Sequence, residues 1–182
     1  MIDVAVSAWF HAHHDPLLTQ FMLAITHWHS TAGILLMAAA LGIGLYRGGR
    51  SWWLLALMLS VPGGLLLNVA IKHLVHRARP HFDDALLTLP TYSFPSGHTA
   101  GATVFYGFLA VLLLAHVGDR IRRVWIVAGA AVMVLLVGLS RIYLGVHYLT
   151  DVLGAVVEGI IWLALCLSGV QARWRRRTGG LV

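Results

Sequence analysis

The residues best suited to chemistry are His147 and Asp151, which lie four positions apart in an otherwise strongly apolar sequence. Residues at i and i+4 of a helix share one face, so the carboxylate could hold one imidazole nitrogen and leave the other free. A histidine oriented in this way can act as a nucleophile or a general base. The spacing therefore predicts a reactive histidine at position 147.

Four further residues that could bind or protonate an anion stand beside the long apolar runs, namely Lys72, Arg79, His98 and Arg141. Charged groups are costly inside a bilayer, and those that occur there are commonly functional. Three cations, a histidine and a histidine–carboxylate pair at the ends of apolar runs favour chemistry on a phosphate group.

The first chemical segment runs from Lys72 to Pro80. Seven residues are nearly two helical turns, so Lys72 and Arg79 are expected on one face if the helix continues that far, with Pro80 helping to end it. Two cations on one face at a helix end would bind an anion. The alternative is that both side chains snorkel toward water at the membrane interface.

The second segment is Pro95-Ser96-Gly97-His98. A tight turn followed by a helix N-terminus offers free backbone N–H groups to a phosphate, and the Ser96 hydroxyl adds a donor. His98 would lie beside the anion, placed to protonate a leaving oxygen. The alternative is a serine that caps the helix, followed by a histidine in its first turn.

The third segment runs from Ser140 to Asp151. It joins two apolar runs by a very short turn, which places Arg141 close to His147. Asp151 lies one turn inside the second run, where an unpaired carboxylate is costly, so we expect a hydrogen bond from His147.

Two polar residues within apolar runs leave two interpretations open. Asn68 lies one turn before Lys72, and Glu158 lies seven residues after Asp151, on about the same helix face. Each could serve the site, or each could pair with a polar group on a neighbouring helix.

Together the three segments resemble the signature motifs of the type 2 phosphatidic acid phosphatase family, whose superfamily includes membrane lipid phosphatases, glucose-6-phosphatase and vanadium haloperoxidases. The resemblance covers residues 72–151. It implies that His147 attacks phosphorus to form a phosphohistidine, that Asp151 orients His147, and that His98 protonates the leaving oxygen and later activates water.

The resemblance also implies a phosphate-binding set consisting of Lys72, Arg79, Ser96, Gly97 and Arg141. Three cations can neutralise the phosphate oxygens, so the family resemblance implies an enzyme that uses no metal and no cofactor. The sequence also lacks the clustered carboxylates that a magnesium site would need.

The composition predicts that these motifs are positioned by membrane helices. Of the 182 residues, 59% are hydrophobic and 11% are charged, about half the charged fraction of soluble domains. The basic residues lie in short gaps between apolar runs, which disfavours a nucleic-acid partner despite the net charge of +6. The single Cys166 excludes an intramolecular disulfide and is interpreted as a small buried hydrophobe.

We predict an all-α transmembrane bundle forming one domain over residues 1–182. Residues 1–28 are expected to form one or two interfacial helices, adding a sixth span only if they insert. The five predicted spans are Thr31 to Tyr46, Trp52 to about Val75, about Ser96 to His116, Val124 to about Ser140 and about Tyr148 to Val170.

The charge distribution predicts an orientation. The turns at 47–50 and 119–123 and the tail at 173–177 carry two, three and four of the thirteen basic residues, and five spans would put all three segments on one side. The positive-inside rule makes that side the cytoplasm. The C-terminus is then cytoplasmic, and the site faces the periplasm or exterior, in what we expect to be a bacterial inner membrane.

The leading hypothesis is a membrane phosphatase that hydrolyses the phosphomonoester or diphosphate headgroup of a lipid at the outer face. The family's substrates include undecaprenyl diphosphate, phosphatidylglycerol phosphate, phosphatidic acid and lipid A, and the small size favours undecaprenyl diphosphate or broad specificity. The alternatives are a lipid phosphotransferase with the same intermediate, and a non-catalytic protein that binds anionic lipid. The expected partners are the substrate and membrane lipids, and the oligomeric state stays open.

Overall fold

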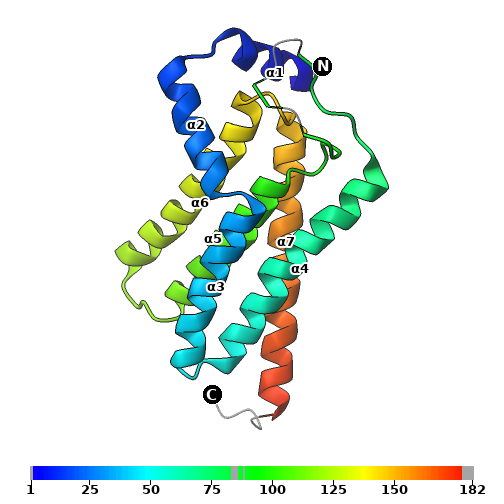
Figure 1. Ribbon diagram of the computed structural model, residues 1–182. Helices are drawn as coiled ribbons and strands as arrows, with labels where there is room; N and C mark the ends of the chain where they lie inside the picture. Colours follow the sequence, from blue (N-terminus) through cyan, green and yellow to red (C-terminus); the bar gives the residue numbers. More distant parts are fainter. Residues whose placement is uncertain (1, 83–85, 88, 178–182) are drawn as a thin grey trace.

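The computed structural model describes residues 2–82, 86–87 and 89–177, and every regular element in these ranges is a helix (Figure 1). The helices are α1 (Ile2–Ala12), α2 (Pro16–Trp28), α3 (Thr31–Arg47), α4 (Ser51–Val75), α5 (Gly97–Leu114), α6 (Arg120–Tyr143) and α7 (Leu149–Arg177). The predicted all-α bundle is confirmed.

Four of these helices, α4 to α7, are long and apolar enough to cross a membrane. A fifth span results if α2 and α3 count as one, because they meet at a 54° bend. The bend has a local cause: α2 ends at Trp28, and Ser30 caps α3 by accepting a hydrogen bond from the Gly33 amide at 3.3 Å. The protein is therefore an integral membrane protein, with α1 lying across one end of the bundle (Figure 1).

Helix α5 forms the centre of the bundle and packs against α3, α4, α6 and α7. More than half of its apolar window is buried (56%), a larger share than in the other three long helices. Small residues allow this packing, because membrane helices gain little from burying apolar surface and depend on close approach. At Gly159 of α7, an added Cβ would lie 2.8 Å from the Cβ of Thr103 on α5.

The N-terminal helices fix the turn between α6 and α7. Tyr143 at the end of α6 is buried beside Met22 of α2 and Phe10 of α1. Its hydroxyl accepts a hydrogen bond from the Asp15 amide at 2.9 Å. Helices α1 and α2 therefore hold the segment that carries His147.

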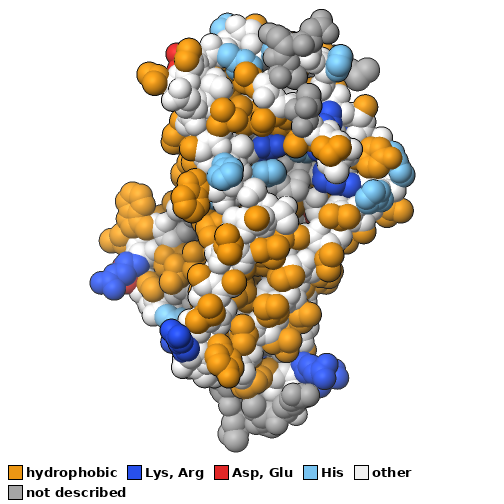
Figure 2. Space-filling view, in the orientation of Figure 1, with side chains coloured by type: hydrophobic (Ala, Val, Ile, Leu, Met, Phe, Trp, Pro, Cys, Tyr) orange, Lys and Arg blue, Asp and Glu red, His pale blue; other side chains and the backbone are white. Residues whose placement is uncertain are grey.

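The two ends of the bundle differ in charge. The α3–α4 turn, the α5–α6 loop and the C-terminal end of α7 lie at one end, where the space-filling view shows isolated blue side chains below an apolar belt (Figures 1 and 2). The α4–α5 loop and the α6–α7 turn lie at the other end, where basic and histidine side chains gather (Figure 2). The predicted grouping of the three basic segments away from the chemical residues agrees with this arrangement.

Replacing Gly159 with alanine should destabilise the bundle, because the new methyl group would overlap Thr103. Overpacking of this kind costs about 1–3 kcal/mol. Gly129→Ala on α6 is the matched control, since a Cβ there would meet no atom within 4 Å. Thermal unfolding in detergent should show a lower midpoint for Gly159→Ala alone, and equal midpoints would contradict the close α5–α7 contact.

Candidate active site

The first segment breaks helical structure earlier than its spacing suggested. Helix α4 ends at Val75, and His76 adopts a left-handed conformation (φ 52°) with its amide donating to the Lys72 carbonyl at 3.1 Å. This C-terminal cap stops the helix before Arg79. The condition under which Lys72 and Arg79 would share a helix face is therefore not met, and Arg79 reaches the site from a loop.

Lys72 holds the loop that precedes α5. Its ammonium donates hydrogen bonds to the carbonyl oxygens of Pro95 (2.6 Å), Tyr92 (2.9 Å) and Ser93 (3.4 Å). Because the half-buried ammonium is bound to three carbonyls, Lys72 does not extend toward water as the snorkelling alternative required. It ties the second chemical segment to the end of the first.

Arg79 joins the same loop to the turn that carries His147. Its Nε and Nη2 donate to the backbone and side chain of Thr91 and to the Tyr92 carbonyl, at 2.7–3.1 Å. Its Nη1 donates to the Val146 carbonyl at 2.7 Å and lies 3.2 Å from Nε2 of His147. Because a guanidinium can only donate, Nε2 of His147 faces it with a lone pair.

The other imidazole nitrogen faces Asp151. Nδ1 of His147 lies 3.4 Å from Oδ2 of Asp151, longer than a normal hydrogen bond, and Nδ1 has no hydrogen-bond partner among the described residues. Oδ2 instead accepts from the hydroxyl of Ser93 and from the Tyr148 amide at 2.8 Å. The pair comes together as predicted, but as an electrostatic contact and without the expected hydrogen bond.

The surroundings of His147 keep its imidazole neutral. The side chain is 2% exposed, and this burial lowers the pKa of His147 to about 4. Repulsion from Arg79 and Arg141 contributes to this lowered pKa, whereas Asp151 acts in the opposite direction. A neutral imidazole whose Nε2 carries the lone pair is the nucleophilic form.

The second segment starts α5 at the predicted place. Ser96 is fully buried at the N-cap position, but its hydroxyl accepts from Thr99 and makes no cap bond to the backbone. Its amide donates to the Asp151 carbonyl at 3.1 Å. At Gly97, an added Cβ would lie 3.2 Å from Oδ1 of Asn68, so glycine keeps this approach open.

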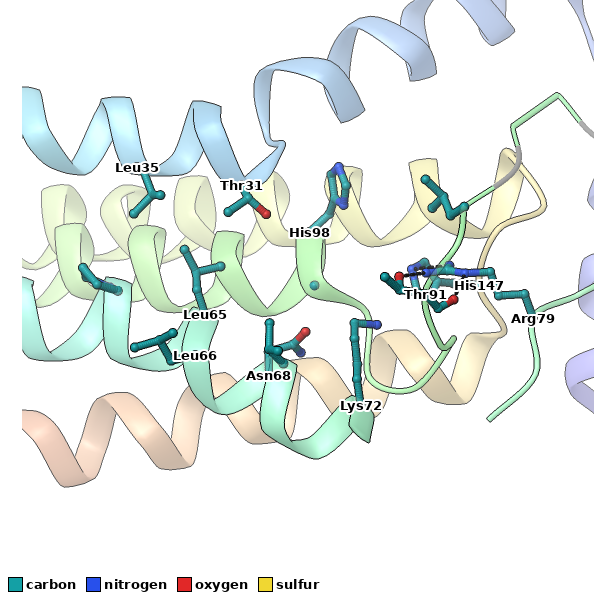
Figure 3. Close-up of a pocket in the computed structure, with 14 residues that line it drawn as sticks. Thr31, Leu35, Leu65, Leu66, Asn68, Lys72, Arg79, Thr91, His98 and His147 are labelled. Atoms are coloured by element: carbon teal, nitrogen blue, oxygen red, sulfur yellow. Dashed lines mark hydrogen bonds between the residues drawn. The ribbon is translucent and has the colours of Figure 1, made fainter. Parts of the chain in front are cut away.

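A cavity of about 510 Å³ joins these residues. Lys72, Arg79, Gly97, His98 and His147 line one part of it, and mainly apolar side chains of α3, α4 and the α4–α5 loop line the rest. Figure 3 shows His147 beside Arg79 and Thr91, whereas His98 projects from the first turn of α5 toward the break between α2 and α3.

Arg141 lies on a neighbouring cavity of about 450 Å³, which shares His98 with the first. The side chain is 1% exposed and contacts the Thr26 hydroxyl through Nη1, while its Nε has no partner among the described residues. A buried guanidinium N–H without an acceptor is rare and indicates a place for an anion. Ser96 and Asp151 line neither cavity and support the site from behind.

Across the described part of the chain, no three histidine, cysteine or acidic side chains are grouped as metal ligands. The cations around the cavity are the groups available here to balance an anion.

The sequence matches the PAP2 superfamily over residues 50–175, which is more than half of the chain and includes all three motif segments between Lys72 and Asp151. The chain belongs to the PAP2 superfamily.

Individual PAP2 relatives agree with this assignment. Phosphatidylglycerophosphatase B of Bacillus subtilis (strain 168) is 35% identical over 177 residues, which cover 96% of this chain and 85% of the relative. Undecaprenyl-diphosphatase BcrC of the same strain is 32% identical over 163 residues, covering 82% and 74%. The predicted family, and the prediction of a phosphatase, are confirmed.

The fold agrees as well. The crystal structure of a transmembrane PAP2-type phosphatidylglycerolphosphate phosphatase from Bacillus subtilis matches with a TM-score of 0.83 and 32% identity, covering 94% of this chain and 85% of that one.

Two contacts of this PAP2 site were not predicted from the sequence. Ser93 binds Asp151 from within the loop, and no periodic pattern marks it. Arg77 donates to Asp151 at 2.7 Å from a loop position that its sequence neighbours do not mark as part of the site. Spacing left the roles of Asn68 and Glu158 open: Asn68 donates to Glu158 at 2.9 Å between α4 and α7, and Asn68 also lines the 510 Å³ cavity.

His147 should stay neutral at acidic pH. An ordinary histidine, with a pKa of about 6.5, is mostly protonated at about pH 5.5. The lowered pKa of His147 predicts a neutral imidazole at that pH. NMR of ¹⁵N-histidine-labelled protein, with His147→Gln to assign the signal, tests this, and a protonated ring at about pH 5.5 would contradict the geometry.

Proposed function

We propose that this protein is an integral-membrane lipid phosphatase that hydrolyses a phosphomonoester or diphosphate headgroup through a phosphohistidine at His147. The observation that carries the proposal is the 510 Å³ cavity, where the nucleophilic face of a neutral histidine, two cations and apolar helix surfaces meet. The related phosphatidylglycerophosphatase and undecaprenyl-diphosphatase support the substrate class.

The cavity walls suit a lipid. Leu35 of α3 and Leu65, Leu66 and Val69 of α4 line its apolar side, and Leu66 is 71% exposed. In a membrane, that exposed surface faces acyl chains. A lipid could therefore keep its tail between α3 and α4 while its headgroup reaches Lys72 and Arg79 (Figure 3).

In the first step, Nε2 of His147 attacks phosphorus, the N–P bond forms and the bond from phosphorus to the leaving oxygen breaks. His98 gives its proton to that oxygen. Asp151, 3.4 Å from Nδ1, stabilises the positive charge that develops on the imidazole. A small movement of the ring would close this distance to a hydrogen bond.

In the second step, His98 accepts a proton from water, whose oxygen attacks phosphorus while the N–P bond breaks. Inorganic phosphate then leaves and His147 is neutral again. His98 suits both steps because it lines both cavities and can exchange protons with either.

The phosphate oxygens would be bound by Lys72, Arg79 and Arg141, with the Gly97 amide as a further donor, whereas the fully buried Ser96 hydroxyl would support these groups from behind. The unpaired Nε of Arg141 would gain an acceptor in this complex. Cations fixed before the substrate arrives stabilise the transition state without reorganising. We therefore propose that hydrolysis needs no metal.

We also propose that the site faces the periplasm or exterior of a bacterial inner membrane, with the C-terminus in the cytoplasm. The separation of the basic segments from the site along the bundle supports this orientation (Figures 1 and 2).

Purified protein should release phosphate from phosphatidylglycerol phosphate, undecaprenyl diphosphate or phosphatidic acid in detergent with EDTA present. His147→Ala should lower this rate by at least about a thousandfold, because the nucleophile is lost. His116→Ala, which alters an exposed histidine at the other end of the bundle, is the matched control. Unchanged release by His147→Ala would refute the proposal, and comparing kcat/KM across the three lipids identifies the preferred substrate.

Narrowing the apolar side of the cavity should affect long-chain substrates selectively. Leu35→Trp would place an indole between α3 and α4, raising KM for a long-chain lipid phosphate by about threefold or more while leaving a water-soluble phosphomonoester unaffected. Leu36→Trp is the control, because Leu36 is 71% exposed and lies outside the lining. Equal effects on both substrates would argue against a tail between these helices.

A further inference from the structure

The N-terminal helix reaches the proposed catalytic centre through one side chain. Asp3 of α1 accepts hydrogen bonds from the amide of Thr150 at 3.0 Å and from its hydroxyl at 2.5 Å. Its Oδ2 also accepts from Nη2 of Arg77 at 2.7 Å. The N-terminal helix α1 is thereby joined to the start of α7 and to the loop that follows α4.

Arg77 spans two carboxylates. While Nη2 binds Asp3, Nη1 donates to Oδ1 of Asp151 at 2.7 Å and to the Thr150 hydroxyl at 2.6 Å. The guanidinium carbon lies 4.4 Å from the centre of the Tyr148 ring, which supports the group from one face. The forked shape of arginine makes this double contact possible, and lysine could not reproduce it.

The two oxygens of Asp151 are therefore divided between two tasks. Oδ1 takes the hydrogen bond from Arg77, and Oδ2 faces His147 and accepts from Ser93 and Tyr148. A carboxylate fixed through both oxygens cannot rotate freely. Neither Asp3 nor Arg77 lines the cavity, so they act through Asp151 and not on the substrate.

We propose that Asp3 and Arg77 are positioning residues, which fix the rotation of Asp151 and set how much negative charge it presents to His147. This proposal rests on the proposed function, because it gives Asp151 its role beside the nucleophile. It assigns to the N-terminal helix a part in the phosphatase site that the three sequence motifs do not include.

The charges explain the direction of the effect. The positive charge of Arg77 partly neutralises the negative charge of Asp151, and the negative charge of Asp3 partly neutralises that of Arg77. The exposed fractions of the side chains rise from 0% for Asp151 to 15% for Asp3 and 30% for Arg77. Water therefore screens the contact between Arg77 and Asp151 less than the contact between Arg77 and Asp3. Although burial opposes it, hydrogen bonds from Thr150 and Arg77 lower the pKa of Asp3. Burial acts to lower the pKa of Arg77, but the carboxylates of Asp3 and Asp151 raise it.

Variants of Asp3 or Arg77 leave the other charged groups around His147 unchanged. The charged and titratable side chains facing it are Lys72 of α4, Arg79 of the loop, His98 of α5, Arg141 of α6 and Asp151 of α7, while His29 after α2 acts on His98. Arg77 contacts Asp151 among these. Changing Asp3 or Arg77 therefore alters the electrostatic effect of Asp151 on His147 and leaves the other charged neighbours in place.

The test is an NMR titration of His147 in the substrate-free protein, which needs no activity. Arg77→Gln removes a positive charge, so imidazolium is favoured and the midpoint should rise by roughly half a unit or more. Asp3→Asn removes a negative charge, so at about pH 4 the ring should be less protonated than in the unmodified protein. A purely structural contact would not give shifts of opposite sign.

Turnover supplies the second readout. For a water-soluble phosphomonoester, Arg77→Gln should lower kcat about tenfold or more and leave KM within about twofold, because the substrate contacts stay intact. Arg77→Lys should keep the midpoint of His147 near its normal value but recover kcat only in part, since the charge returns without the fork.

The matched controls are Arg122→Gln and Asp119→Asn, which alter an exposed ion pair of 3.8 Å in the first turn of α6. Both should leave the titration and kcat unchanged. Unshifted midpoints, or midpoints that move in the same direction for Asp3→Asn and Arg77→Gln, would overturn the positioning role. Because His147→Ala tests the nucleophile separately, failure of this proposal is distinguishable from failure of the proposed function.

Discussion

Cations buried beside a neutral histidine are the constraint on which the site depends. Lys72, Arg79 and Arg141 repel one another, and each loses hydration on burial. The protein offsets this cost with carbonyl oxygens, which accept from Lys72 at Tyr92, Ser93 and Pro95, and from Arg79 at Thr91, Tyr92 and Val146. The cations are thus fixed before an anion is bound, and a phosphate would add stronger acceptors to donors that already point inward.

The irregular backbone around the site follows from this need for carbonyls. Carbonyl oxygens inside a helix are occupied by amides four residues later, and only a non-helical segment leaves a row of them free. The left-handed His76 ends α4 and starts such a segment, which returns to α5 through Pro95. If α4 had continued to Arg79, the cations would share a face but lack acceptors. Irregular backbone near the membrane is tolerated where it is buried in protein or lines a cavity, as here.

How much of this could be predicted depended on the range of each interaction. The i, i+4 spacing of His147 and Asp151 and the short turn after Arg141 are local features, so the sequence predicted their proximity, and apolar run lengths predicted the spans. Spacing could not decide whether Lys72 and Arg79 share a helix, since seven residues fit a helix or a folded loop equally well. The contacts of Ser93 and Arg77 with Asp151 join residues far apart in sequence, and nothing local marks them.

The position of the cavity determines how the substrate of the proposed reaction could enter and how its products could leave. Its apolar wall is formed by α3 and α4, while its polar end lies beside the loop and turn at the rim of the bundle (Figure 3). A lipid phosphate reaching the site along these helices would not need to leave the bilayer, and its headgroup would meet cations already stripped of much of their water. Hydrolysis separates the two parts of such a substrate. The lipid product loses charge and is held more weakly by Lys72 and Arg79, whereas inorganic phosphate is soluble and can leave through the rim, so each product departs into the solvent that suits it.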